Sequence, residues 1–407
     1  MTNDELAYIL MYADDMCILS DNVNDMQRKI RCLEKYCTSS GLSVNLDKTK
    51  MVVFRNGGIL KRSEKWYYKD ASISITSYYS YLGMIFSSRL LWSTCIGNLC
   101  SKALRLVSRV RSLCKRYDNI DTKILFTIFD IKIKPLLLYG CEIWGVECRK
   151  DIENVHVKFC KAVLNVGKTT HNSLVLSECG RYHLYVTYYV RAIKYWHKLL
   201  IMDNKRYAKK CYLQCVLLDK SGRKNWASDL RKLVCSLGFG YAWSYQSIGD
   251  IKNFILQVKQ RLIDMSIQET RSNITAFNFD LNYFDFHPNF CPAPYLSFID
   301  SSKDRRVISL LRTFSLPIKN NLIRINMSND NVCNHCVRKF AENEFHVILT
   351  CTRYDSIRNI FLDKFQYANS KEDKLVKFNY LLSCKNQSTT IQLIHFLRNT
   401  SKHISND

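Results

Sequence analysis

A short acidic turn near the N-terminus most constrains what this chain can fold into. The sequence Tyr12-Ala13-Asp14-Asp15 stands between two apolar runs, one at residues 6–11 and one at residues 16–19. Two short apolar runs on either side of a tight polar turn are typical of a β-hairpin. Two adjacent carboxylates at the tip repel each other unless cations lie among them. We therefore expect either a solvated turn, which is what most Asp-Asp pairs form, or a site for Mg²⁺.

The residues that follow predict a helix packed on an antiparallel sheet. Met26, Ile30, Leu33 and Cys37 recur at helical spacing, and Gly41 is a natural stop for that helix. Strand-like apolar patterns occur at residues 44–46, 51–53, 66–68, 73–75 and 81–86. The pattern indicates an α+β fold.

Two further motifs complete an ordered set with the acidic turn. Residues 41–50 read GLSVNLDKTK, and residues 81–88 read YLGMIFSS. In this order and spacing they resemble the second half of the palm in reverse transcriptases of non-LTR (LINE-type) retrotransposons. The resemblance continues through residues 135–145, 156–160 and 178–182 and ends in a Cys/His cluster near residue 340, so it covers most of residues 6–360.

This resemblance implies an RNA-directed DNA polymerase, which is a DNA nucleotidyltransferase that joins dNTPs to a primer end by two-metal chemistry. In the resembled family the hairpin aspartates bind the catalytic metal. Asp14 is accordingly the expected main Mg²⁺ ligand and Asp15 the supporting one. The resemblance places Lys48 near the pyrophosphate leaving group, although a solvated lysine explains this residue equally well.

The region before the hairpin is much shorter here than in the resembled family. Fingers and the first half of the palm, which carries another metal-binding aspartate, come before the hairpin in that family, and an N-terminal endonuclease is common. Residues 1–5 alone precede the first expected strand here. We expect the truncated C-terminal portion of a transposable-element polyprotein, inactive alone, whose partner is the missing N-terminal part. The rival hypothesis is a non-catalytic remnant that binds nucleic acid and zinc.

The charge of the chain indicates a polyanionic partner. Its 60 Lys and Arg residues outnumber 36 Asp and Glu residues, which gives a formal net charge of +24. RNA and DNA are the leading candidates, and an anionic membrane surface is the second. No apolar run reaches the roughly 18 residues of a membrane span, and Asp4 and Glu5 argue against a signal peptide. The 18 cysteines form no disulfide framework, so we expect reduced thiols in an intracellular protein of the nucleus or cytoplasm, not bound to a membrane.

One predicted helix concentrates the positive charge. Residues 101–117 contain no acid, and Ala103, Leu106, Val110 and Leu113 form an apolar stripe along them. The other positions hold the basic residues Lys102, Arg105, Arg109, Arg111, Lys115 and Arg116. A solvated basic face is a common feature of surface helices. In a polymerase, such a helix belongs to the thumb and contacts the phosphates of template and primer.

A cysteine cluster near the C-terminus has the spacing of a metal site. Cys333, Cys336, His346 and Cys351 follow the pattern C-x2-C-x9-H-x4-C. A close cysteine pair presents two thiolates to one ion, and the later histidine and cysteine complete a tetrahedral set that suits Zn²⁺. We expect a helix over residues 344–350 to carry His346, and His335 to face outward. In the resembled family such Cys/His knuckles bind nucleic acid.

These patterns divide the chain into five expected parts. They are a partial palm at 1–91, a helical thumb-like region at 92–165, a helical connector at 166–300, a zinc-knuckle-like module at 301–365 and a helical tail at 366–407. Prolines make residues 277–294 the best candidate for a linker. Aromatic and basic residues alternate over 185–210, where the aromatic side chains form either core or stacking surfaces for single-stranded nucleic acid.

Overall fold

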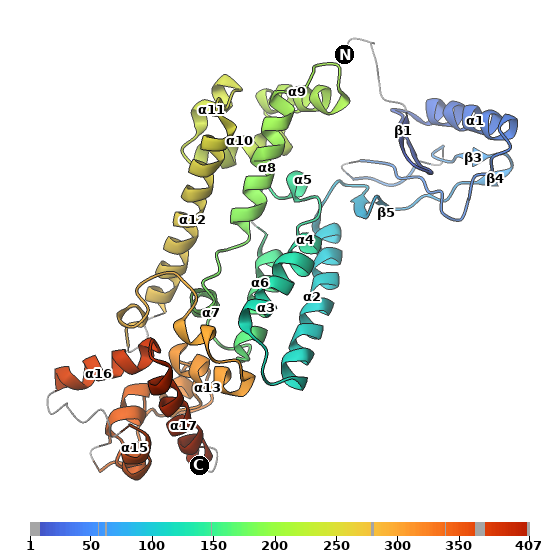
Figure 1. The fold of residues 1–407 in the computed structure, drawn as a ribbon. Coiled ribbons are helices and arrows are strands. Elements are labelled where there is room, and N and C mark those ends of the chain that lie inside the picture. The colour runs from blue at the N-terminus through green and yellow to red at the C-terminus, as the bar shows by residue number, and fades with distance from the viewer. Residues whose placement is uncertain are drawn as a thin grey trace. The chain divides into compact units, whose positions relative to one another are not determined.

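A computed structural model describes residues 9–55, 57–61, 63–147, 149–277, 281–337, 339–362 and 371–404 (Figure 1). The chain forms two compact units. Unit 1 comprises Met1–Asn98 and Lys198–Ser228, and unit 2 comprises Leu99–His197 and Asp229–Asp407. Helices predominate, and the described strands form small antiparallel sheets, so the predicted α+β class is confirmed. None of the described helices combines the length and hydropathy that crossing a bilayer requires.

Unit 1 contains every named strand of the described chain. Its elements are β1 (Ile9–Tyr12), β2 (Asp15–Ile18), α1 (Val23–Ser39), β3 (Tyr67–Tyr68), β4 (Ala71–Ser72), β5 (Tyr78–Tyr81), β6 (Met84–Ser87) and α9 (Tyr207–Lys220). Three helices begin in one unit and end in the other along the chain: α2 (Ser93–Arg116), α8 (Tyr185–Leu200) and α10 (Trp226–Ser236).

Helix α1 forms where the sequence predicts it. The Asn22 side chain caps its start by accepting a hydrogen bond from the Asp25 backbone N–H at 2.9 Å. Gly41, with φ of +65°, ends it, and the Leu42 N–H donates to the Cys37 carbonyl at 2.8 Å. Ile30 and Cys37 are buried on the predicted apolar face. Ile30 packs in one cluster with Trp66, Tyr68 and Ile73.

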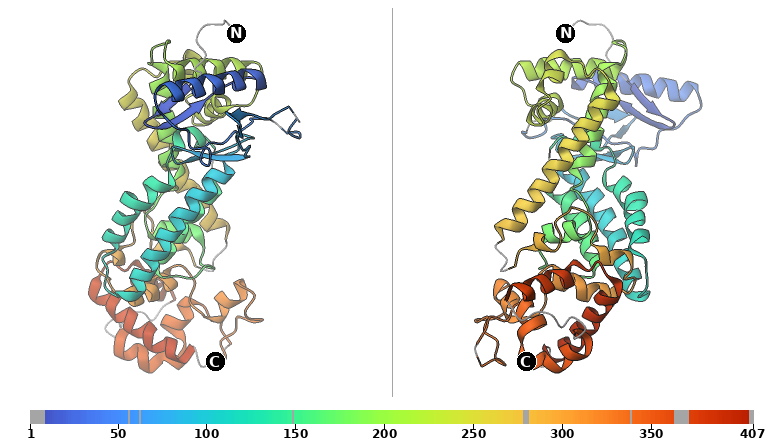
Figure 2. Two further views of the ribbon diagram at one scale, coloured as in Figure 1. Left: turned by 90° about the vertical axis from the view of Figure 1, so that its right-hand side faces the viewer. Right: turned by 60° about the vertical axis from the view of Figure 1, so that its left-hand side comes forward.

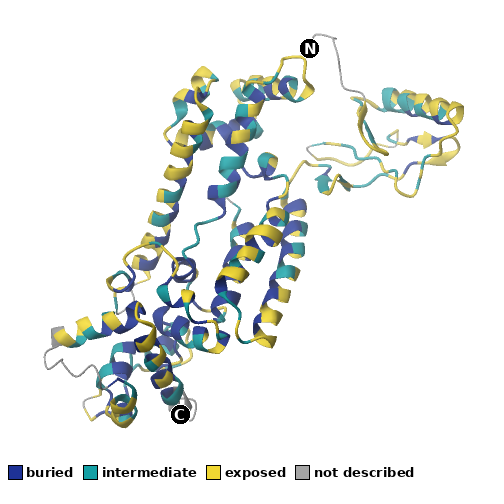
Figure 3. Cartoon of the chain, viewed as in Figure 1, coloured by how far each residue is buried: buried dark blue, intermediate teal, exposed yellow. Residues whose placement is uncertain are grey.

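The strands form three separate two-stranded sheets, β1–β2, β3–β4 and β5–β6, and the expected single sheet under α1 is wrong. Residues 81–86 are also not one strand. Leu82 and Gly83 have φ of +49° and +79° and make a two-residue turn, across which Tyr81 pairs with Met84. Figure 3 shows β1 exposed along its length, in agreement with its residue exposure.

The strands predicted at residues 44–46 and 51–53 are absent from the named elements. Asn45 explains the first difference, because its side chain accepts a hydrogen bond from the Lys48 N–H at 3.1 Å while its carbonyl accepts one from the Thr49 N–H at 3.0 Å. Such local bonds replace strand pairing with a turn. Met51 forms an isolated parallel bridge with Ile75. The alternating apolar side chains still pack against the cluster beneath α1.

Unit 2 is described as helices joined by loops. It contains α3 (Thr122–Ile128), η1 (Phe129–Ile133), α4 (Lys134–Leu137), α5 (Cys141–Trp144), α6 (Lys150–Leu164), α7 (Asn172–Glu178), α11 (Gly240–Tyr245), α12 (Ile251–Ala276), η2 (Tyr283–Asp285), η3 (Pro294–Ser297), α13 (Ser302–Arg312), α14 (Lys319–Arg324), η4 (His346–Thr350), η5 (Thr352–Tyr354), α15 (Asp355–Leu362), α16 (Lys371–Ser383) and α17 (Gln387–Ile404). In Figure 2, α12 is the long yellow helix, and the red helices near the C-terminus gather at one end of this unit.

The buried face of α2 in unit 2 includes Ala103 and Val110 of the predicted stripe, but Leu106 is only half-buried. Ala103, Val107, Val110 and Cys114 are buried, whereas Leu113 is 42% exposed. The helix starts at Ser93, and the side chains of Val107 and Cys114 continue the face that Ala103 and Val110 define. Leu113 therefore lies among the solvent-facing residues of this helix.

A fully buried ion pair lies at the centre of unit 2. The Arg312 guanidinium donates to both carboxylate oxygens of Glu178, with Nε to Oε2 at 2.9 Å and Nη2 to Oε1 at 2.8 Å. Neither side chain is exposed. The Tyr283 hydroxyl donates to the same carboxylate at 2.8 Å. Burial alone would raise the pKa of Glu178, but the adjacent Arg312 outweighs it and keeps the pKa low.

The predicted linker at residues 277–294 is wrong over the described residues 281–294. Tyr283 and His287 are buried, the Ala293 N–H donates to the Glu178 carbonyl at 2.8 Å, and Pro292 forms a bridge with Cys179. Residues 278–280 of that segment lie outside the described chain. The prolines therefore shape a loop that packs on α7, and they do not separate two parts of unit 2.

Breaking the Glu178–Arg312 pair should destabilise the protein strongly. Arg312→Met leaves a buried carboxylate without its partner, so we expect the free energy of unfolding to fall by about 3–5 kcal/mol in urea denaturation. Removing both charges, with Glu178→Leu added, should restore part of that loss. The matched control is Arg398→Met, which removes a half-exposed pair with Asp304 and should cost about 0–1 kcal/mol. Equal losses for the two single variants would contradict the assignment.

Candidate metal centre and acidic hairpin

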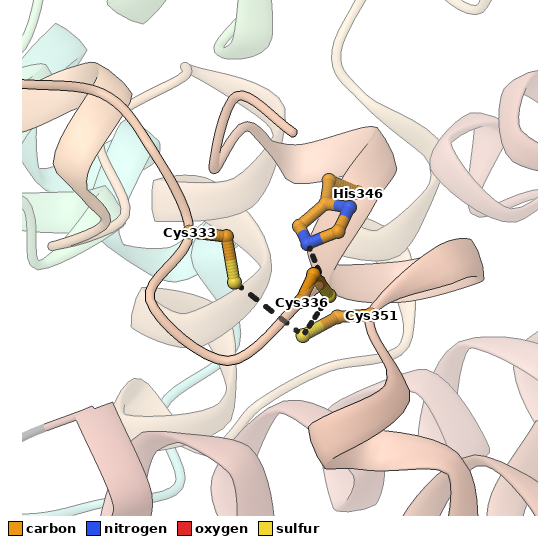
Figure 4. Close-up of side chains that lie close together, drawn as sticks. All are labelled: Cys333, Cys336, His346 and Cys351. Carbon is orange, nitrogen blue, oxygen red and sulfur yellow. Dashed lines mark hydrogen bonds between the residues drawn. The ribbon is translucent and has the colours of Figure 1, made fainter. Parts of the chain in front are cut away.

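The four residues of the Cys/His pattern converge in unit 2. One ligand atom from each of Cys333, Cys336, His346 and Cys351 lies within 4.8 Å of the other three, and all four residues are buried (Figure 4). The Cys333 and Cys351 sulfurs are 3.9 Å apart, and the Cys336 and Cys351 sulfurs are 3.8 Å apart. The Cys336 sulfur is 3.4 Å from His346 Nε2.

These separations fit a tetrahedral ion. Bonds of about 2.3 Å to sulfur and about 2.0–2.1 Å to nitrogen, at tetrahedral angles, place two sulfurs about 3.8 Å apart and a sulfur and a nitrogen about 3.6 Å apart. The observed distances lie within a few tenths of an ångström of these values. The buried group can therefore hold a metal ion.

A short β-like turn presents the first two thiols. Val332 and Ala341 form an antiparallel bridge, and the Cys333 N–H donates to the Phe340 carbonyl at 2.8 Å. The Lys339 N–H donates to the Cys336 carbonyl at 3.1 Å. This hairpin turns the chain within the two-residue gap of the motif, so both thiols face the same point.

A helical turn presents the other two ligands, His346 and Cys351. The helix predicted over residues 344–350 is present, and its last five residues form a π-helical turn. Asn343 begins the turn by accepting a hydrogen bond from the His346 N–H at 2.9 Å. Element η4 is a π-helical turn, and the Cys351 N–H donates to the His346 carbonyl at 2.8 Å, five residues back. The four-residue gap between His346 and Cys351 thus corresponds to one π-turn, which brings both side chains to the same end.

Thr350 fixes the orientation of the His346 ring. The His346 Nδ1 lies 2.9 Å from the Thr350 hydroxyl, which donates in turn to the His346 carbonyl at 3.3 Å. A hydroxyl engaged in this way accepts the Nδ1–H, which leaves Nε2 with a free lone pair toward the thiols. Burial, with the nearby Arg358, lowers the pKa of His346 and favours the neutral ring that a metal requires.

The thiols differ in acidity. Burial raises the pKa of Cys351 to about 12. Burial would also raise the pKa of Cys336, but hydrogen bonds from Thr352 and the neighbouring thiols outweigh it and lower that pKa. Cys336 is therefore a more acidic thiol than Cys351, and a cation that binds the group displaces protons from its thiols.

His335 lies inside the same sequence motif but outside the cluster. Its side chain is exposed and contacts the Arg353 guanidinium, as the expected outward orientation requires. The sequence analysis missed Thr350 and Asn343, which hold His346 from positions four residues after and three residues before it. Their spacing from His346 could have identified them, because polar residues three or four positions from a helical ligand can hydrogen-bond to it.

The acidic pair lies at the tip of the β1–β2 hairpin in unit 1, as predicted. Tyr12 pairs with Asp15 in the antiparallel register, so Ala13 and Asp14 form a two-residue turn and Asp15 begins β2. Ala13 has φ of +54°, the left-handed conformation that such a tight turn uses. Both aspartates are exposed. They belong to no group of three or more metal-ligating side chains within the described ranges.

The β1–β2 hairpin and Lys48 each interact with a tyrosine of β5. Burial raises the pKa of Tyr81, and the negative charges of Cys17 and Asp15 add to this rise. The Tyr79 hydroxyl donates to the Lys48 carbonyl at 3.2 Å. The Lys48 side chain is exposed and forms no ion pair with a residue that the structure describes.

The basic residues predicted on the helix at 101–117 lie on the unit 2 segment of α2. Lys102 is half-buried, and Arg105, Arg109, Arg111, Lys115 and Arg116 are exposed. The Arg116 guanidinium lies 5.8 Å from the centre of the Tyr117 ring. None of the six pairs with an acidic side chain in the described part of the chain. The face therefore keeps its full positive charge.

Some of the aromatic and basic residues at 185–210 are buried, whereas Lys194, Lys198, Lys205 and Arg206 are exposed. Tyr188 and Trp196 are fully buried. Lys209 is buried in unit 1, where its ammonium donates to the carbonyls of Leu199 and Leu200 at 3.0 and 2.9 Å and satisfies the end of α8.

Comparison with known proteins adds one finding to this geometry. No curated protein and no solved structure matches the chain. A family model does match, over residues 3–86, and these residues contain the acidic hairpin, α1 and the Tyr81–Met84 turn. The N-terminal part of the chain is therefore similar to the family described as reverse transcriptase (RNA-dependent DNA polymerase).

Proposed function

We propose that this chain is part of an RNA-directed DNA polymerase of a non-LTR retrotransposon. The observation that carries the proposal is the position of Asp14 and Asp15. They lie at a hairpin tip inside residues 3–86, the segment similar to reverse transcriptases. Exposed adjacent carboxylates on a tight turn suit Mg²⁺, which prefers oxygen ligands and keeps several waters. Asp14 is the main ligand in this proposal, Asp15 the supporting one, and Lys48 the group near the leaving pyrophosphate.

The proposed division of labour follows the order of the chain. Residues 1–91 form part of a palm, residues 92–165 a thumb-like region, and residues 166–300 a connector. Residues 301–365 form a zinc-knuckle-like module, and residues 366–407 form a helical tail. The palm portion would position metal and primer end, and the helical parts and the knuckle would hold RNA and DNA.

Mn²⁺ binding tests the hairpin assignment directly. We expect Mn²⁺ to broaden the NMR signals of residues 12–16, because the paramagnetic ion would sit on the two carboxylates. Asp14→Asn should abolish this broadening. Asp21→Asn, which removes an exposed carboxylate of the same unit just after β2, should leave it unchanged. Broadening that persists in Asp14→Asn, or none in the parent protein, would overturn the assignment.

The chain by itself should not extend a primer. Two-metal transfer needs carboxylates around both ions, and the described residues bring no third metal-ligating side chain to Asp14 and Asp15. We therefore expect no product with a homopolymer template, its primer, dNTPs and either Mg²⁺ or Mn²⁺. Extension that Asp14→Ala abolishes would contradict this expectation while supporting the polymerase assignment. Extension that survives Asp14→Ala would contradict both.

We also propose that the basic face of α2 binds the phosphate backbone of RNA and DNA. Its charged side chains lack acidic partners in the described chain, and a nucleic-acid strand supplies them. Contacts of this kind carry no base preference.

Binding should accordingly weaken steeply with salt and depend little on sequence. The slope of log affinity against log salt should be about −0.7 for each phosphate contacted on a single strand. Arg105→Glu with Arg109→Glu should weaken binding of all sequences alike in fluorescence anisotropy. The matched control reverses two exposed charges on α12, Lys259→Glu with Arg261→Glu, and should have a smaller effect. Equal effects would show that net charge alone matters.

We propose Zn²⁺ as the ion of the Cys333, Cys336, His346 and Cys351 group. Three thiols and one imidazole are the ligand set that a structural zinc site uses, and the separations fit its bond lengths. The bound ion would hold the hairpin at residues 332–341 and the π-turn together.

Elemental analysis of the reduced protein should give one equivalent of zinc. His346→Ala should lose it, and His335→Ala should keep it, because the His335 side chain is exposed and points elsewhere. Zinc should dissociate as the pH falls, since protons compete for the thiolates. Less than about half an equivalent in the parent protein would remove the proposal, and equal loss in both histidine variants would mean that the wrong histidine is assigned.

A further inference from the structure

Unit 1 contains a polar hollow of about 300 Å³ that is separate from both sites described above. Two guanidinium side chains, Arg55 and Arg89, and the glycine turn Gly57-Gly58 lie around it. Hydroxyl side chains supply most of the remaining polar lining. Pockets for neutral organic ligands are mainly apolar and aromatic, so this lining indicates a charged ligand.

Backbone hydrogen bonds between distant segments build the walls. The Arg55 N–H donates to the Ser88 carbonyl at 3.0 Å, and the Ser88 N–H donates to the Ser77 carbonyl at 2.8 Å. The Thr76 N–H donates to the Met51 carbonyl at 2.9 Å. These hydrogen bonds join the chain segments at residues 51–55, 76–77 and 88 around the hollow and give it a defined shape. The hydroxyls of Ser77 and Ser88 form no hydrogen bond with described residues, which leaves them available to a ligand.

The glycine turn keeps one side of the hollow open. Gly57 and Gly58 have φ of +146° and +91°, backbone conformations that other residues rarely adopt. A β-carbon at either position would meet no atom within 4 Å. The turn thus exposes its backbone to solvent, and a ligand can approach it closely.

The two guanidinium groups differ in how they are held by neighbouring residues. Arg55 is fixed, because Nη1 donates to the Ile59 carbonyl at 3.0 Å and Nη2 donates to the Glu64 carboxylate at 3.0 Å. The other N–H donors of Arg55 are not used in these two bonds. Arg89 is exposed and forms no ion pair or hydrogen bond with the residues that the structure describes. Two arginines and no acidic side chain line the hollow, so its lining has a net positive charge.

We propose that this hollow binds a phosphate group of a nucleic-acid backbone. Guanidinium groups pair with phosphate oxygens through parallel N–H bonds, and hydroxyls and an open glycine backbone add further donors. Arg55 would act as the rigid donor and Arg89 as the free one. The choice of a backbone phosphate rests on the proposed function. The phosphate chemistry itself rests only on the hollow, and a free nucleotide shares it.

Inorganic phosphate tests the site without nucleic acid. We expect phosphate to shift the side-chain Nε–Hε NMR signals of Arg55 and Arg89 and to leave that of Arg31 in place. Arg31 is an exposed arginine of α1 in the same unit. Unmoved signals for Arg55 and Arg89 would overturn the site whatever the outcome for nucleic acid.

A single-stranded RNA 12-mer then identifies the source of the phosphate. Arg89→Ala should reduce the slope of log affinity against log salt by about 0.7, the value for one lost phosphate contact on a single strand, and Arg31→Ala should leave it unchanged. Equal slopes in the two variants would overturn the backbone assignment. A dNTP that displaces phosphate in the absence of any effect on RNA binding would assign the hollow to a free nucleotide instead.

RNA binding and phosphate binding can fail separately. If the parent protein does not bind RNA at low salt, the proposed function fails, and the NMR shifts with phosphate still decide the hollow. If RNA binds and Arg105→Glu with Arg109→Glu weakens it, but Arg89→Ala does not, the hollow fails alone.

Discussion

The buried pair of Glu178 and Arg312 is the interaction on which unit 2 depends. Its two charges are removed from water, and such charges cost several kcal/mol each unless every partner is in place. The partners come from separate elements. Glu178 ends α7, Arg312 ends α13, Tyr283 donates from η2, and the Leu382 carbonyl of α16 accepts from the guanidinium. These elements therefore have to assemble together, and the Cys/His cluster is carried between α13 and α16 in the sequence.

The motif at residues 178–182 has a structural role in unit 2. In residues 178–182, Glu178 forms the ion pair, and Gly180 adopts φ of +58° where a β-carbon would lie 2.3 Å from the Pro292 nitrogen. Arg181 donates to both carboxylate oxygens of Asp130 at 2.8 and 2.7 Å. All three residues serve packing in unit 2. The candidate chemistry lies elsewhere, on the hairpin of residues 12–15 and in the Cys/His cluster.

Local patterns predicted local structure and little else. The hairpin, helix α1 with its stop at Gly41, and the metal spacing all depend on residues close in sequence, so periodicity and turn chemistry suffice. The turn at Asn45 needed a side chain to compete with strand pairing. The packing of residues 281–294 on α7 depends on contacts such as Tyr283 to Glu178, 105 residues apart, which no sequence period records. The prolines of this segment predicted a linker, whereas in the structure the segment packs on α7.

The fold also explains why so much positive charge remains on the surface. Several carboxylates are used internally: Glu153 accepts the backbone N–H groups of Leu184 and Tyr185 at 2.9 Å each, and Asp118 accepts from two serines at the start of α13. Carboxylates that accept hydrogen bonds inside the protein are not available to pair with exposed lysines and arginines. With 36 acidic residues against 60 basic ones, the excess appears where acids are locally missing, on α2 and around Arg89. A polyanion could supply the charge that the protein's own acids do not, and this is the physical basis of the proposed nucleic-acid binding.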